Sequence, residues 1–128
     1  MTGYTDTFGG STLQAAQVAY AAVSLSANLP LFWPPFCTGT QQPCARLMDV
    51  TPTGAGLAVL LPDARLAGLG QDVFFSNPGA YSYTVQDSTG GVVATIAPGT
   101  QRYIYLIDNT TAAGTWRTIL MEIGRAHV

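Results

Sequence analysis

Apolar and polar residues alternate along much of this chain, and this pattern predicts β-strands. In residues 23–33 every second residue is apolar, as expected of a half-buried strand whose successive side chains point to opposite faces. Pro30 lies inside this run and cannot donate a ladder hydrogen bond, so we expect an edge strand or a break there. Further short strands are predicted at residues 46–50, 57–61, 72–76, 81–86, 92–96, 101–107 and 116–121.

Turn sequences separate these runs. "NPGA" (77–80) and "APGT" (97–100) place Pro second and Gly third, which is typical of a type II turn. "DSTGG" (87–91) is typical of a hairpin loop with a glycine in the left-handed conformation. Short strands at close spacing predict a mainly β fold, an antiparallel β-sandwich or a barrel-like domain.

One short N-terminal helix is also expected. In "STLQAAQVAYAAV" (11–23), Leu13, Ala16, Tyr20 and Val23 follow a helical stripe, and Ser11 could cap it. Residues 1–12 are rich in Gly, Thr and Ser and are expected to form an extended arm. The chain then divides into this arm, a single β-domain over residues 13–121, and a tail at 122–128.

The tail differs from the rest of the chain. Glu122 and His127 are the only Glu and His of the protein, and no Lys is present. Back-translation of "EIGRAHV" matches the start of a widely used sequencing adapter, so residues 122–128 are expected to be translated adapter and not native. We therefore expect that deleting residues 123–128 leaves the melting temperature unchanged.

Composition limits the classes of partner. The 128 residues are 48 % apolar and only 9 % charged, with a net charge of −2, so a neutral surface or one buried against other subunits is expected. No basic patch suits nucleic acid, and no apolar run is long enough for a membrane span. The N-terminus does not resemble a signal peptide.

The usual catalytic side chains are missing from residues 1–121, which hold six Asp, four Arg, two Cys and six Tyr but no His, Glu or Lys. We expect no enzyme activity, no catalytic residue, no cofactor and no metal site. The Asp residues mostly lie at predicted strand ends and turns, where Asp caps backbone groups. Cys37 and Cys44, with six residues between them in a Pro-rich loop, could close a disulfide or remain thiols.

The aromatic residues allow two interpretations. They could pack in a core or between subunits, or form a platform on which sugars stack. The residues concerned are Trp33, Tyr81, Tyr83, Tyr103, Tyr105 and Trp116. In "RYIYLI" (102–107) apolar groups point to both faces of the strand, so the second face is covered either within the chain or by another chain.

The stretch from "LAVLLPDARLAGLGQDVFFSN" to "GTW" resembles a small β-domain of tailed-bacteriophage structural proteins, especially tail fibres and other virion appendages. The shared pattern comprises an apolar strand ending in Leu-Pro (60–62), "GQDVFFSN" (70–77), an alternating strand followed by "DSTGGVVATIAPG" (81–99), and an aromatic strand closing with "DN…GTW" (103–116). "YTDTFGG" and "SANLPLFWP" are similar to the N-terminal parts of such chains. The Cys pair is not part of the pattern.

The resemblance implies a structural virion protein, made in the cytoplasm of the host bacterium, that folds rigidly and assembles with other virion proteins, often as a homotrimer. A capsid-decoration protein is the variant of this interpretation in which the chain stops early. A carbohydrate-binding module of a phage or bacterial surface protein is the alternative function. An enzyme would need a pair of Asp residues in a cleft.

Overall fold

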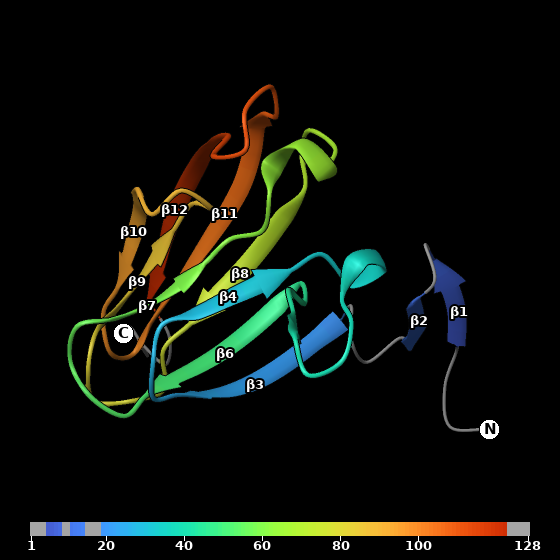
Figure 1. Cartoon of the computed structure of the whole chain (residues 1–128). Helices are drawn as coiled ribbons and strands as arrows, with labels where there is room; N and C mark the ends of the chain where they lie inside the picture. The colour runs from blue at the N-terminus through green and yellow to red at the C-terminus, as the bar shows by residue number, and fades with distance from the viewer. Residues whose placement is uncertain (1–4, 9–10, 15–18, 123–128) are drawn as a thin grey trace.

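The computed structural model describes residues 5–8, 11–14 and 19–122, which form two five-stranded sheets and a separate two-stranded hairpin (Figure 1). The hairpin pairs β1 (Thr5–Phe8) with β2 (Ser11–Gln14). Two short 3-10 turns, η1 (Pro34–Phe36) and η2 (Ala64–Leu66), lie between strands. The mainly β prediction is confirmed.

The first sheet, here called the β7 sheet, has the strand order β10-β9-β7-β4-β5. Its strands are β4 (Leu29–Phe32), β5 (Gln42–Pro43), β7 (Leu57–Leu60), β9 (Tyr83–Gln86) and β10 (Val92–Ile96). The second, here called the β8 sheet, has the order β12-β11-β8-β6-β3. Its strands are β3 (Tyr20–Leu25), β6 (Leu47–Pro52), β8 (Asp72–Ser76), β11 (Thr100–Asp108) and β12 (Thr115–Glu122).

The two sheets bury their facing side chains in one core. The period of two determines which residues enter it: in β8, Val73 and Phe75 are buried, whereas Asp72 and Phe74 lie on the opposite face. Both sheets supply buried members of the same cluster, among them Met48, Val50, Val73, Phe75 and Ile104 from the β8 sheet and Val59, Tyr83, Val85, Ala94 and Ile96 from the β7 sheet. One face of the β8 sheet is thereby left outside the core, and we call it the outer face.

The expectation of antiparallel sheets is wrong, because five of the nine strand pairs described are parallel. The reason is the path of the chain, which passes from one sheet to the other between β3 and β4, and again at each step from β6 to β9. From β6 to β9 each strand is therefore followed by one in the opposite layer, and β6 and β8, like β7 and β9, run in the same direction. Within the two five-stranded sheets, the hairpins described are β9–β10 and β11–β12.

The predicted strand at residues 23–33 is two strands in different sheets, broken at residues 26–28 rather than at Pro30. Pro30 pairs with Leu60 on one side of β4, and β5 reaches only Leu31 and Phe32 on the other. The missing N–H of Pro30 therefore costs β4 little, because no residue of β5 is paired with Pro30 on that side. The expected helix is not shown, since residues 11–14 and 20–23 belong to strands and residues 15–18 lie outside the described part.

One of the two predicted type II turns is confirmed. Gly99 has a φ of 75°, and the Thr100 N–H donates to the Ala97 carbonyl (3.2 Å). Gly90 in the "DSTGG" loop is also left-handed, with a φ of 94°. Gly79 does not have a positive φ; its N–H donates to the Asn77 side chain (2.9 Å), so a side chain holds that turn.

Candidate functional site: the outer face of the β8 sheet

A row of large apolar side chains crosses all five strands of the outer face. The register pairs Ile119 with Tyr103, Tyr103 with Phe74, Phe74 with Leu47 and Leu47 with Tyr20. Partners opposite each other in a ladder point to the same face, so these five residues form one continuous apolar row. With neighbouring strands about 4.8 Å apart, the row is about 19 Å long.

Exposure differs along the apolar row. Its two ends are the most accessible members, Tyr20 at 46 % and Ile119 at 50 %, whereas Leu47, Phe74 and Tyr103 are half-buried among their neighbours. Tyr105 adds to the aromatic surface, because its ring lies 5.5 Å from that of Tyr103 at 31°. The Phe74 ring lies 4.7 Å from Tyr103 at 40°.

Two aspartates hold the tyrosine hydroxyls of this face in place. The Tyr20 hydroxyl donates to Asp49 (2.6 Å), which also accepts the Ser76 hydroxyl. The Tyr103 hydroxyl donates to Asp72 (3.0 Å), and Arg46 pairs with the same carboxylate (3.1 Å). These hydrogen bonds to carboxylates raise the pKa of both Tyr20 and Tyr103.

The other aromatic candidates lie elsewhere. Trp33 is 6 % exposed and stacks on half-buried Trp116, with ring centroids 6.5 Å apart at 29°, so these two indoles pack between the layers. Tyr83 is buried in the core, with its hydroxyl donating to the Ser76 carbonyl (2.9 Å), and burial raises its pKa. Tyr81 is 46 % exposed in the connection before β9. Of the six, only Tyr103 and Tyr105 therefore share the outer face.

The acidic residues divide into two groups. Asp63, Asp87 and Asp108 accept backbone N–H groups of Arg65, Thr89 and Thr110 respectively (each 2.9 Å), as expected of Asp residues that cap turns. Asp49 and Asp72 instead lie on the outer face within strands. Asp49 is in register with Ser76 on the neighbouring strand, four residues from Asp72 along β8, so the backbones of the two residues are about 14 Å apart, farther than the carboxyl pairs of glycosidases.

The cysteines are not joined in the structure. Cys44 is a free thiol, 4 % exposed, and burial raises its pKa to about 12. The Cys37 thiol donates to the Gln41 carbonyl (3.1 Å), and burial raises its pKa as well.

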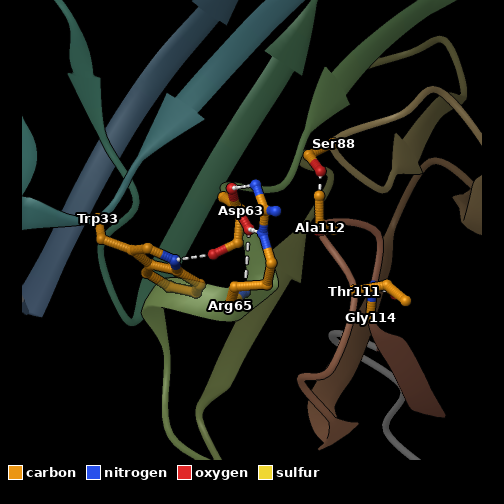
Figure 2. A network of polar contacts seen from close by, with 7 residues as sticks. All are labelled: Trp33, Asp63, Arg65, Ser88, Thr111, Ala112 and Gly114. Carbon is orange, nitrogen blue, oxygen red and sulfur yellow. Dashed lines mark hydrogen bonds and ion pairs between the residues drawn. The ribbon is translucent and has the colours of Figure 1, made fainter.

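A second surface feature is an apolar groove of about 280 Å³ between η1 and η2, lined by residues that include Trp33, Phe36, Leu60 and Leu66. Figure 2 shows that its polar neighbours bond within the chain. The Trp33 indole N–H donates to the Asp63 carbonyl (2.8 Å), the Arg65 guanidinium holds the Asp63 carboxylate (2.7 and 3.0 Å), and the Ser88 hydroxyl donates to the Ala112 carbonyl (2.8 Å). Because these polar groups already have partners within the chain, the groove can offer a ligand mainly apolar contacts.

Two further findings concern residues 5–8, 11–14 and 19–122. Among them, no three His, Cys, Asp or Glu side chains cluster in a way that could hold a metal ion. No helix there is long and apolar enough to cross a membrane.

Comparisons of this chain with protein-family models, with curated proteins and with solved structures found no match.

Sequence reasoning missed four members of the apolar row: Tyr20, Leu47, Phe74 and Ile119. Tyr20 was assigned to the expected helix, although the alternation of Ala21, Val23 and Leu25 continues the strand pattern back to it. Leu47 and Phe74 carry no signal of their own, because a row across a sheet depends on the register of strands that are distant in sequence.

Proposed function

We propose that this chain is a structural protein of a virion appendage, such as a tail fibre or a head or tail attachment module, that acts by folding and assembling. The observation that carries the proposal is the apolar row on the outer face. The core of a permanent interface is apolar and enriched in aromatic residues, and the row together with Tyr105 has this composition.

Low charge supports the same proposal. With 9 % charged residues, little electrostatic repulsion keeps copies of the chain apart. On the outer face the Asp72 charge is paired with Arg46, so the face can be covered without leaving that carboxylate unpaired. The partner that we propose is a second copy of this chain, in a homotrimer as the resemblance implies, together with other virion proteins.

The test is sedimentation velocity of the full chain at tens of micromolar, with Tyr105→Asp as the disruptive variant. We expect a trimer for the unaltered chain and a folded monomer for Tyr105→Asp, because the new carboxylate would be buried in the interface. Tyr81→Asp is the matched control, since Tyr81 is an exposed tyrosine that lies in the connection before β9 and not in a strand of the β8 sheet. A monomeric unaltered chain would contradict the proposal.

A second candidate, a carbohydrate-binding module, rests on one observation. Phe74, Tyr103 and Tyr105 lie together beside Asp72 and Arg46, and this combination of rings and charged groups can bind sugars. The rings are tilted by 31° and 40° rather than coplanar, so they offer no flat platform. Titration with a panel of bacterial surface glycans separates the candidates: binding that Tyr105→Ala abolishes, by a chain that stays monomeric, would favour the module.

A further inference from the structure

The edges of the two sheets differ in how well they are protected against pairing with another chain. Natural proteins blunt exposed edges with prolines, bulges or very short strands. The β7 sheet follows this rule, because β10 has an irregularity between Val92 and Ala94, and β5 is a two-residue strand that contains Pro43.

Within the described residues, the edges of the β8 sheet carry few such devices, the charges of Arg117 and Glu122 in β12 being the exceptions. The edge strand β3 has six residues, "YAAVSL", without a proline or a charge. The other edge strand, β12, has eight residues, and its ladder with β11 is regular except where β12 begins, between Leu106 and Asp108. Ile119, Leu120 and Met121 of β12 are exposed at 50 %, 51 % and 36 %. Both edges are therefore open to strand addition.

The directions of these two strands allow them to pair with each other in different copies. β3, β6 and β8 are parallel, β11 is antiparallel to β8, and β12 is antiparallel to β11. β12 consequently runs in the same direction as β3. A rotation about an axis along the strands can bring β12 of one copy beside β3 of another as a parallel pair, which extends the parallel half of the sheet.

The apolar row indicates the register of that pair. Its exposed ends, Tyr20 on β3 and Ile119 on β12, lie at the two opposite edges of the sheet. Placing Tyr20 beside Ile119 covers both ends at once. Because the strands are parallel, the same register places Ala22 beside Met121, and these are again small or apolar.

We propose that β3 of one copy pairs in parallel with β12 of the next copy, with Tyr20 beside Ile119, so that the apolar row continues from copy to copy around a closed ring. This inference rests on the proposed function and adds the interface by which the copies join. A two-fold pairing of β12 with β12 would leave β3 open in every copy, whereas head-to-tail pairing in a ring leaves neither edge exposed.

A charge exchange in the full chain tests this pairing. Ile119→Glu and Tyr20→Lys should each weaken association by about tenfold or more, because each places a charged side chain in an apolar interface that the partner copy does not complement. The double variant should recover association, since Lys of one copy then lies beside Glu of the next. A mixture of the two single variants should form at least a pair. Val92→Glu is the matched control, an edge residue of the β7 sheet that is exposed at 64 %, and should assemble as the unaltered chain does.

Circular dichroism and thermal unfolding verify that each variant folds. If Tyr20→Lys fails to fold without its bond to Asp49, the pair Ala22→Lys and Met121→Glu tests the same register one step along the strands. Three results would overturn the inference: single variants that assemble like the unaltered chain, a folded double variant that stays dissociated, or sensitivity to Ile119→Glu alone, as β12–β12 pairing requires.

The outcomes also separate this inference from the proposed function. A monomeric unaltered chain contradicts both. Suppose instead that the unaltered chain assembles, that Tyr105→Asp dissociates it, and that Ile119→Glu and Tyr20→Lys do not change its assembly. This result would leave the proposed function intact and exclude the edge pairing.

Discussion

Asn77 ties the two sheets together, and its replacement should be costly. It lies directly after β8 and is fully buried. Its side-chain amide donates to the carbonyls of Tyr81 (2.7 Å) and Ile96 (2.9 Å), and its Oδ1 accepts the Gly79 N–H (2.9 Å). One side chain thus links the end of β8 to the connection before β9 and to the end of β10.

Asn77→Ala would leave two carbonyls and one N–H without these partners. A buried polar group left unsatisfied costs about 1–3 kcal/mol. Because two of the three bonds are only partly buried, we count the low end, about 1 kcal/mol, for each of the three groups. We therefore expect the free energy of unfolding to fall by about 3 kcal/mol. At about 4 °C per kcal/mol for a domain of this size, the melting temperature should fall by about 12 °C.

Urea unfolding followed by circular dichroism measures this loss. Asn77→Asp should be at least as destabilising at pH 7, because it keeps the acceptor for Gly79 but points a carboxylate oxygen at two carbonyls. The matched control is Asn28→Ala: Asn28 is exposed and accepts a single bond from the Ala58 N–H (3.0 Å), so about 1 kcal/mol should be lost. If Asn77→Ala costs no more than Asn28→Ala, this account of the turn is wrong.

Three further predictions concern other parts of the fold. Gly114→Ala should lower the free energy of unfolding by about 2 kcal/mol or more, because Gly114 has a φ of 70° and a new Cβ would meet the Ala64 Cβ at 2.5 Å. The control Gly39→Ala, at a φ of 59° with open space around it, should cost about 1 kcal/mol, and equal losses in urea unfolding would refute the packing argument. Cys44, whose pKa is raised to about 12, should resist alkylation at pH 8 until the protein unfolds, as peptide mass spectrometry would show; rapid labelling of the folded protein would contradict its burial. Hydrogen bonds from Arg65 lower the pKa of Asp63, so the stabilisation that they give is present above the pKa of an unfolded Asp, about 3.9, and is lost as pH falls through the lowered pKa. In Asp63→Asn, the free energy of unfolding should therefore fall less between neutral pH and that range, and an unchanged fall would count against the pair.

Local pattern predicted the strands well but not their arrangement. β8 and β10 begin and end at the predicted residues, because Val73, Phe75, Ala94 and Ile96 bury one face of a strand by strict alternation. The alternation does not show to which of the two sheets a strand belongs. The parallel pairing of Met48 with Phe75 depends on the chain having crossed to the β7 sheet in between.

The candidate site was predicted only in part for the same reason. Tyr103 and Tyr105 were recognised because their own strand shows two apolar faces. The partners Phe74 and Leu47, on β8 and β6, join them only through the register. Asp49 lies near the end of the strand predicted at residues 46–50, where Asp residues were expected to cap turns. It instead lies within β6 and accepts hydroxyl groups, since the strand continues to Pro52.

The alternation of the chain between the sheets has a consequence for synthesis on the ribosome. When β3, β6 and β8 have emerged, β8 still lacks the neighbour β11 on its other side, and the β7 sheet still lacks β9 and β10. The pairs formed by then are parallel and join segments distant in sequence, so their loop-closure entropy opposes early structure. The hairpins β9–β10 and β11–β12 come last and complete both layers. The two sheets should therefore be completed only after β11 and β12 have emerged, and a nascent chain halted before β11 should remain sensitive to protease.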